Sequence, residues 1–198
     1  MGTLTHGSGG DGLGVVNMVK YAIDKYSADA SKVYVFGGSS GAMMTNALAG
    51  SYPDVFEAGA AFSGVAHACF AGSTQPPTPF SSNQTCAQGL EHSAADWAKF
   101  AYNSYPGYTG KRTRMQIWHG NADTLVRPKC AAEALKQWSE VLKAPFNKNN
   151  TGVPSSAYTQ MMYGDATGSQ LQGYFGNGVG HIAPVNEVYM LRFFGLIS

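Results

Sequence analysis

The feature that most constrains the fold is a short apolar run that leads directly into five small residues. Residues 33–36 are Val-Tyr-Val-Phe, which favours a buried β-strand, and residues 37–41 are Gly-Gly-Ser-Ser-Gly. A helix-compatible segment follows at once, at residues 42–49. The order strand, sharp turn, helix predicts that Ser39 stands above the end of the strand, with Gly37 and Gly41 leaving space around it. The first turn of the helix then places backbone N–H groups and its positive dipole end beside this serine.

The five-residue pattern is weak by itself, because the chain has 25 glycines and the pattern arises easily in such a composition. The alternative is a glycine-rich turn with incidental serines, and the flanking strand and helix favour the first interpretation. Ser40 is an alternative nucleophile. It fits better as the residue after the nucleophile, whose backbone N–H stabilises a developing oxyanion.

The rest of the chain alternates predicted strands with predicted helices. We expect strands at residues 58–62, 115–118, 158–163 and 171–175, and helices at 15–26, 94–102, 129–142 and 185–194. This alternation predicts one α/β domain over residues 1–198, a layered sandwich with a mainly parallel sheet. Residues 5–12 and 143–155 are expected to be loops. Residues 70–90, with Pro76, Pro77 and Pro79, are expected to be an irregular excursion of a length typical of functional loops.

Composition excludes several classes of partner. The net charge is +1, so nothing indicates a field that would attract nucleic acid. No apolar run approaches the length of a membrane span, and residues 1–10 have no pattern of a secretory signal. The three cysteines leave at least one thiol outside any internal pair. Cys69 and Cys86 flank the part of this excursion that is rich in Pro, Ser and Gln and are placed to staple it, and three reduced thiols are the alternative.

A serine hydroxyl needs a base to take its proton and a third group to orient that base. Asp123 follows a predicted strand directly, and His181 lies in a glycine-rich loop before the last predicted helix. Serine, acid and histidine come in this order along the chain in one known class of hydrolases. The sequence therefore predicts a triad of Ser39, Asp123 and His181.

Other residues compete for these roles. His119 adjoins the acid and is expected to support its loop, His92 precedes a helix in a solvated position, and His6 is a candidate to line the site. Asp96 is expected to be an acid in the first turn of a helix, and Asp165 to lie in a turn. An isolated Asp after a strand or a single His is more often structural, so the assignment depends on all three members occurring in order and in context.

Segments along nearly the whole chain resemble the acetylxylan esterases of carbohydrate esterase family 1, with related feruloyl esterases and polyhydroxybutyrate-depolymerase-like esterases. They are residues 29–46, 52–56 and 61–66, His119-Gly-Asn-Ala-Asp123, and Gly178-Val-Gly-His181. The resemblance implies an α/β-hydrolase fold and the triad Ser39, Asp123 and His181. It also implies a secreted enzyme that removes acetyl groups from xylan without a cofactor or metal.

The chain departs from the family pattern at its front, because the N-terminal strands of the family are absent before Thr3. The strand at residues 33–36, central in the family, would then have an open edge, which invites pairing with another chain. We expect self-association through this edge, or cover by residues 1–12. One absent loop supplies the second oxyanion donor in the family, and the glycine-rich loop at residues 7–12 is the candidate replacement beside the Ser40 N–H.

The leading interpretation is a serine esterase that acts on acetylated xylan or a related plant cell-wall polysaccharide. Loop positions give His67, Trp118 and Tyr163 as candidates to contact that substrate. One alternative is a feruloyl esterase of the same fold, which needs an aromatic acyl pocket. The other is a catalytically weak or inactive remnant that binds carbohydrate, which the missing oxyanion loop favours and the complete triad opposes.

Overall fold

The computed structural model describes residues 4–71 and 83–198, so the three prolines at positions 76, 77 and 79 lie outside the described residues. Its strands form one mixed sheet in the order β1-β2-β3-β6-β5-β4. The strands are β1 (Tyr34–Gly38), β2 (Ala58–Phe62), β3 (Arg114–Gly120), β4 (Phe146–Thr151), β5 (Tyr158–Tyr163) and β6 (Leu171–Gly176). The helices are α1 (Gly10–Tyr26), α2 (Ser40–Ser51), α3 (Gln84–Ala87), α4 (Ala94–Ser104), α5 (Lys129–Val141) and α6 (Glu187–Phe194).

The sheet is mainly parallel, as the alternation of elements predicts. β1, β2, β3 and β6 are parallel neighbours, and β5 and β4 extend the sheet as antiparallel strands. Because the carboxyl ends of the parallel strands meet at one edge, the loops that follow β1, β2, β3 and β6 converge there. These four loops carry the candidate site.

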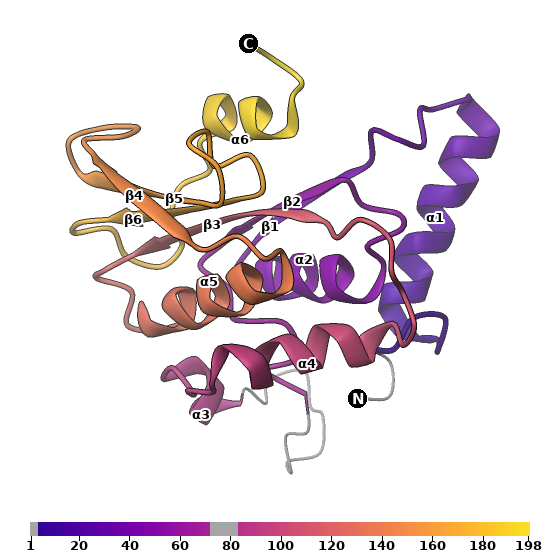
Figure 1. The fold of residues 1–198 in the computed structure, drawn as a ribbon, viewed down its shortest axis with the longest axis horizontal. Coiled ribbons are helices and arrows are strands. Elements are labelled where there is room, and N and C mark those ends of the chain that lie inside the picture. The colour runs from indigo at the N-terminus through magenta and orange to yellow at the C-terminus, as the bar shows by residue number, and fades with distance from the viewer. Residues whose placement is uncertain (1–3, 72–82) are drawn as a thin grey trace.

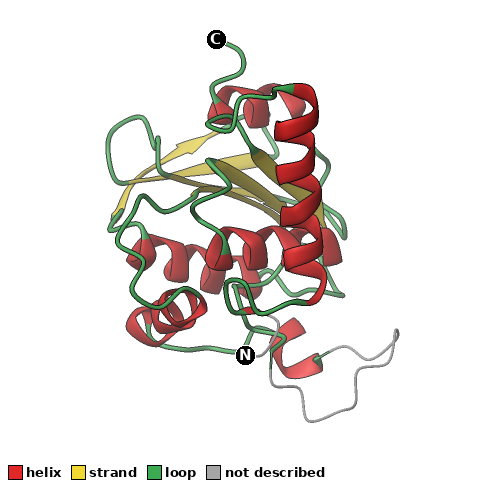
Figure 2. Ribbon diagram, turned by 90° about the vertical axis from the view of Figure 1, so that its right-hand side faces the viewer, coloured by secondary structure: helices red, strands yellow, loops and turns green. Residues whose placement is uncertain are grey.

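Helices cover both faces of the sheet (Figures 1 and 2). α2 and α5 lie against one face with α4 packed outside them, and α6 covers the other face. The larger core fills the α2 and α5 side and includes Trp97 and Trp138, while the smaller one beneath α6 includes Trp118 and Tyr174. This arrangement is a layered α/β sandwich around a mainly parallel sheet, as the alternation of strands and helices predicts.

α1 packs beside α2, and Val16 contacts a small cluster with Leu48, Tyr52 and Phe56. α1 begins at Gly10 rather than at Val15, so the expected loop at residues 5–12 is shorter than the sequence indicated. β4 is a second difference, because residues 143–155 were expected to be a polar loop. Five of the six β4 residues are exposed, so the strand carries no apolar alternation from which it could be predicted.

A disulfide joins Cys69 and Cys86, which are 17 residues apart, and Cys130 is a buried free thiol. Of the two alternatives for the cysteines, the structure shows the staple around the excursion. Within the excursion, residues 84–87 form the short helix α3, and the Asn83 side chain caps it by accepting from the Cys86 N–H.

β1 is an outer strand of the sheet, and residues 4–12 do not cover its edge. They pack instead at the far end of α2, where the Ser51 hydroxyl donates to the Leu4 carbonyl and the Gly7 N–H donates to the Tyr52 hydroxyl. Phe36 on β1 remains 55% exposed. The expected cover by residues 1–12 is therefore absent for the described part of that segment, residues 4–12.

Candidate active site

Ser39 lies between the end of β1 and the start of α2. Its backbone has φ 54° and ψ −118°, a conformation that is strained for a residue with a side chain. The Ser39 N–H donates to the Phe62 carbonyl at 2.9 Å, and its own carbonyl accepts from Met43 N–H at 3.1 Å, so both sides of the turn are fixed. The strain therefore persists because β2 and α2 hold the turn from both directions.

Gly37 is required by this turn. A Cβ placed on Gly37 would lie 2.4 Å from the backbone carbon of Gly41, which is far closer than real atoms approach. A Cβ on Gly41 would meet nothing within 4 Å. The close approach thus needs glycine on the strand side of Ser39 only, whereas the sequence pattern indicated a need on both sides.

Three side chains from distant parts of the chain meet above the sheet edge. His181 Nε2 lies 2.8 Å from Ser39 Oγ, and His181 Nδ1 lies 2.8 Å from Asp123 Oδ2. The structure thus brings together the three residues that the sequence singled out, in the geometry of a Ser-His-Asp triad. The His181 side chain is 14% exposed and that of Asp123 is fully buried, so solvent reaches the base but not the acid.

Asp123 is held by its own loop as well as by His181. Its Oδ1 accepts from the backbone N–H groups of Leu125 at 3.0 Å and Val126 at 2.9 Å. Burial alone would raise the pKa of Asp123, but the hydrogen bonds from His181, Val126 and Leu125 keep that pKa below its ordinary value. Asp123 is therefore a carboxylate at neutral pH and can hold His181 with its Nδ1 protonated.

The loop that carries His181 is fixed to β3 and to the loop after it. The Ala122 N–H donates to the Val179 carbonyl at 3.0 Å, and Asn121 Oδ1 accepts from the Gly178 N–H at 2.7 Å. A Cβ on Gly120 would lie 1.9 Å from the Val179 oxygen, so glycine at the end of β3 allows this approach.

Ser63 also fixes the His181 loop, and sequence reasoning did not assign it a role. It follows β2 and is fully buried, and its hydroxyl accepts the Ala183 N–H at 2.9 Å. Its position in the sequence could have indicated this role, because a small polar residue directly after a buried strand lies at the same sheet edge as Ser39 and Asp123.

Ser40 is the first residue of α2, so its backbone N–H has no partner within the helix. It follows Ser39 and is the candidate oxyanion donor. In the loop at residues 7–12, the Gly7 N–H donates to the Tyr52 hydroxyl at the opposite end of α2. A second oxyanion donor from the rest of that loop stays a prediction.

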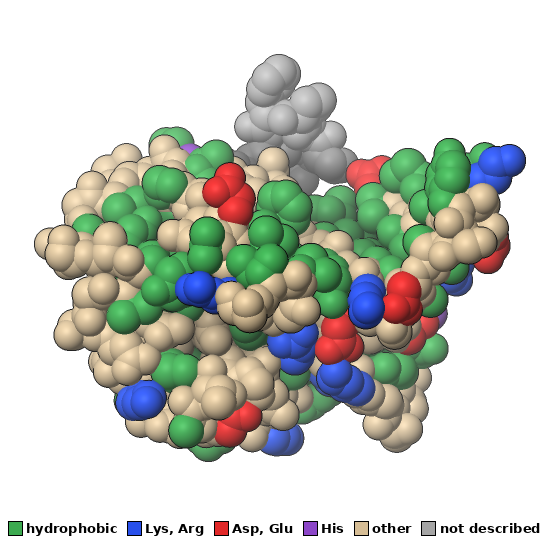
Figure 3. All heavy atoms as spheres, turned by 90° about the horizontal axis from the view of Figure 1, so that it is seen from above, with side chains coloured by type: hydrophobic (Ala, Val, Ile, Leu, Met, Phe, Trp, Pro, Cys, Tyr) green, Lys and Arg blue, Asp and Glu red, His purple; other side chains and the backbone are tan. Residues whose placement is uncertain are grey.

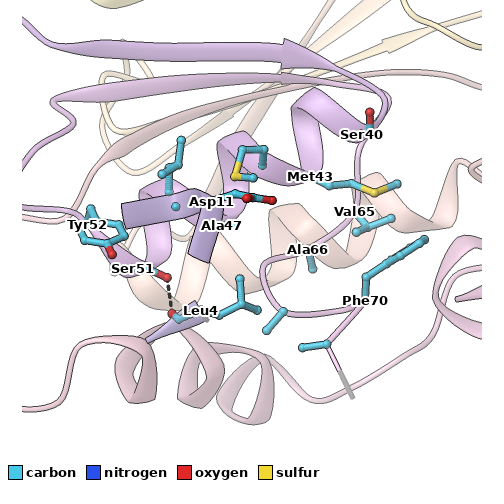
Figure 4. Close-up of a pocket in the computed structure, with 15 residues that line it drawn as sticks. Leu4, Asp11, Ser40, Met43, Ala47, Ser51, Tyr52, Val65, Ala66 and Phe70 are labelled. Atoms are coloured by element: carbon cyan, nitrogen blue, oxygen red, sulfur yellow. Dashed lines mark hydrogen bonds between the residues drawn. The ribbon is translucent and has the colours of Figure 1, made fainter. Parts of the chain in front are cut away.

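A cavity of about 260 Å³ runs along one face of α2, beginning at Ser40 (Figure 4). Met43 and Ala47 line it from the helix, and Val65 and Phe70 line it from the loop after β2. Leu4, Ser51 and Tyr52 form its far end. The cavity is mostly apolar; Ser40, the neighbour of Ser39, lines it, whereas Ser39, Asp123 and His181 do not. It can therefore hold a part of a substrate that extends away from the triad.

The structure does not place the three expected substrate contacts at the site. Trp118 is fully buried and stacks on Tyr174 with ring centroids 3.8 Å apart. His67 is 1% exposed with Nε2 2.7 Å from Ser104 Oγ, and burial lowers its pKa to about 4. Tyr163 is 7% exposed in the core. All three expectations were wrong because these side chains point into the protein and not toward the loops.

The competing residues have other places. His6 stacks on Tyr105 at the far end of α2, and the His92 ring packs on Trp97. Asp96 lies in the first turn of α4, where its N–H donates to the Ser93 hydroxyl, and Asp165 accepts hydrogen bonds within its turn. His119 supports the Asp123 loop as expected, since its Nε2 lies 2.8 Å from the Val126 carbonyl oxygen.

Within residues 4–71 and 83–198, no group of three or more His, Cys, Asp or Glu side chains is arranged to hold a metal ion. Over the same residues, no helix has the length and apolar character needed to cross a membrane.

Comparison with known proteins supports the same class of site. The model of the prolyl oligopeptidase family matches residues 14–161. Feruloyl esterase B of Neurospora crassa is 66% identical over 196 residues, which are 99% of this chain and 66% of that protein. Acetylxylan esterase A of Aspergillus ficuum is 41% identical over 197 residues, which are 98% of this chain and 63% of that protein.

The solved structure of the acetyl xylan esterase from Aspergillus awamori superposes with a TM-score of 0.92 at 40% identity, covering 99% of this chain and 71% of that one. The chain spans less than two thirds of the length of either curated relative. The match to the family model and the superposition bear out the resemblance drawn from the sequence motifs. The chain belongs to the prolyl oligopeptidase family, and among α/β-hydrolases it belongs with the fungal feruloyl and acetylxylan esterases.

Proposed function

We propose that the chain is a serine carboxylesterase that removes acyl groups from plant cell-wall polysaccharides, acetylated xylan first among them. The observation that carries this proposal is the continuous hydrogen-bonded series from Ser39 Oγ through His181 to Asp123 Oδ2, at 2.8 Å for each step. The complete series also argues against an inactive remnant, since a protein that only binds carbohydrate has no need of it. The names of the relatives support the substrate class.

The mechanism follows from these distances. His181 Nε2 takes the Ser39 proton as the hydroxyl attacks the ester carbonyl, and Asp123 holds the imidazole in the correct tautomer. The Ser40 N–H stabilises the oxyanion of the tetrahedral intermediate. His181 then gives its proton to the departing sugar oxygen, and a water activated by the same histidine releases the acid from Ser39.

A second candidate acyl group is feruloyl, and two observations favour it. The feruloyl esterase B relative is 66% identical, against 41% for the acetylxylan esterase. The cavity beside Ser40 measures about 260 Å³, much more than an acetyl group fills and close to the lower end of the range for drug-sized ligands, about 300 Å³.

The site of action is proposed to be extracellular. The Cys69–Cys86 disulfide is typical of proteins that fold in oxidising compartments, and the polysaccharides to which the relatives' names refer lie outside the cell. Self-association through the open edge of β1, beside the exposed Phe36, belongs to the same proposal.

The test compares two neighbouring serines. Ser39→Ala should abolish release of acid from a small aryl acetate, from acetylated xylan and from a feruloylated arabinoxylan fragment. Ser40→Ala should keep most activity, because its proposed contribution comes from the backbone N–H, which alanine retains. Relative rates on the three substrates assign the acyl group.

Two outcomes would contradict the proposal. Activity that survives in Ser39→Ala would remove this serine from the reaction. No activity from a folded parent chain on any of the three esters would favour the carbohydrate-binding alternative.

A further inference from the structure

His119 lies within β3, and its side chain contacts Asp123 of the triad. Its side chain is fully buried in β3, with Nε2 3.3 Å from Asp123 Oδ2 and 2.8 Å from the Val126 carbonyl oxygen. One ring nitrogen thus faces both the acid of the triad and the backbone of the loop that carries the acid. None of the triad roles described above uses this contact.

The surroundings fix which nitrogen of His119 carries the proton. The Val126 carbonyl only accepts hydrogen bonds, so Nε2 must be the protonated nitrogen. Nδ1 is buried and has no hydrogen-bond partner in the described structure, so a second proton there would create a buried, unpaired donor. Burial lowers the pKa of His119 accordingly. His119 is therefore a neutral ring whose Nε2–H donates to the Val126 carbonyl and lies 3.3 Å from Asp123 Oδ2.

His119 and His181 meet on the same oxygen. Asp123 Oδ1 is occupied by the Leu125 and Val126 N–H groups, and Oδ2 lies 2.8 Å from His181 Nδ1 and 3.3 Å from His119 Nε2. A second donor on Oδ2 fixes the direction of its free lone pair and reduces the attraction of the carboxylate for protons.

We propose that His119 is a positioning residue of the esterase reaction: its Nε2–H orients Asp123 Oδ2 and tunes how strongly Asp123 holds the protonated His181. The proposal rests on the proposed function for the reaction that it affects. His119 would then be a fourth side chain of the catalytic arrangement, and it would act on Ser39 only through Asp123 and His181.

The direction of the effect follows from the charges around Asp123. In the described structure the titratable groups that interact with it are His119, His181 and the Cys130 thiol of α5. The thiol is neutral, because burial raises the pKa of Cys130 to about 11. Without the His119 N–H, Asp123 would attract the positive charge that develops on His181 during the reaction more strongly, so the acid limb of the pH profile should move to higher pH.

The experiment compares His119→Leu, which removes the donor, with His119→Gln, whose amide can restore one. His67→Leu is the matched control, because His67 is also buried with an unpartnered Nδ1 but bonds to Ser104 and not to the triad. Two readouts are needed: the pH profile of kcat/KM on an aryl acetate, and the low-field proton resonance of the His181–Asp123 hydrogen bond.

For His119→Leu we expect kcat to fall about tenfold, with KM little changed, as for loss of one hydrogen bond to a charged group. The acid limb of the profile should move up by roughly half a pH unit to one unit, and the low-field resonance should shift. His119→Gln should recover most of the lost kcat and return the acid limb and the low-field resonance toward those of the parent. His67→Leu should lower the melting temperature but leave the limb and the resonance in place.

A His119→Leu protein with the parent's pH limb and resonance would show that the residue only supports packing, and would overturn the proposal. If that variant does not fold, His119→Gln and His119→Asn replace it, since the shorter Asn amide does not reach Oδ2. Equal limbs and equal resonances in that pair would overturn the proposal too. Should the parent chain hydrolyse no ester, the proposed function fails, while the resonance still tests the His119 contact separately.

Discussion

At the scale of single residues, the site depends on how closely two backbone segments approach at the turn after β1. Ser39 has a positive φ, and Gly37 lies so near Gly41 that no side chain fits on it. The strain is local, and the hydrogen bonds of Ser39 to Phe62 and Met43 sustain it. The position of Ser39 is thus set by backbone geometry more than by its own side chain.

A pair of glycine substitutions tests whether the close backbone approach at this turn is required for the fold. Gly37→Ala should cost several kcal/mol of stability or prevent folding, since a backbone overlap at 2.4 Å cannot be relieved by moving a side chain. Gly41→Ala should be neutral or stabilise by up to about 1 kcal/mol, because its Cβ meets nothing and alanine favours a helix. Thermal unfolding of both variants gives the comparison, and equal losses would contradict it.

The meeting of Ser39, Asp123 and His181 could be predicted from the sequence because each residue lies where a chain pattern is informative. Ser39 lies in a strand–turn–helix run, and Asp123 and His181 lie in loops after predicted strands. Trp118, His67 and Tyr163 could not be placed in this way, because the direction of a side chain depends on tertiary packing. The same limit applies to the hydrogen bond between Ser63 and Ala183, which joins segments remote in sequence. It applies as well to the contact between His119 and Asp123, which depends on the direction of the His119 ring.

At the scale of elements, α4 and α5 are joined around one buried carboxylate. Glu133 of α5 is 4% exposed and accepts from Trp97 Nε1, the His92 N–H and Lys136 Nζ. Burial alone would raise the pKa of Glu133, but these hydrogen bonds keep that pKa below its ordinary value of 4.5. The hydrogen-bonded Glu133 carboxylate therefore stabilises the folded state at every pH at which it is ionised.

This pairing predicts how stability depends on pH. Because the pKa of Glu133 is lower in the folded state, its contribution is present above about pH 4.5 and is lost as the pH falls through the folded value. The free energy of unfolding in urea should therefore decrease between pH 5 and pH 3 by less in Glu133→Gln than in the parent. Glu91→Gln, which removes a surface ion pair with Lys129, should keep the parent's dependence. Identical pH dependence in parent and Glu133→Gln would contradict the prediction.

Element prediction succeeded where apolar periodicity was strong and failed where it was weak. The strands β2, β3, β5 and β6 lie within two residues of the predicted ranges. β4 was missed because its side chains are mostly exposed and polar, so only its pairing with β5 makes it a strand. α1 begins earlier than predicted although Gly10 and Gly12 disfavour a helix, and Gly12 lies close to Leu48 and Tyr52 at the end of α2.

At the scale of the whole molecule, apolar side chains remain on the surface at the β1 side. Phe36 on β1 is 55% exposed, and Met18 and Tyr21 on α1 are 64% and 62% exposed. Seen from above, the surface carries apolar side chains in several places, including the projecting part of the molecule that holds α1 (Figure 3). An outer strand beside such residues is a ready template for pairing.

We therefore expect the chain to associate with itself at micromolar concentration. Light scattering coupled to size exclusion should give a mass above the 20.9 kDa of the monomer, and Phe36→Lys should shift it back. Lys148→Ala, a change on the exposed outer strand β4 at the other side of the sheet, is the control and should leave the mass unchanged. A monomeric parent at all concentrations would exclude association through β1.

The order of strands also determines when the protein can first act. The hydrogen bond between Ser39 and His181 joins residues 142 positions apart, and it needs β1, β2, β3 and β6 side by side. Contacts this remote in sequence form slowly, after the entropy of closing a long loop has been overcome. For the proposed esterase, the ability to hydrolyse esters is thus acquired late in folding, so an unfinished or partly refolded molecule should show no activity toward esters.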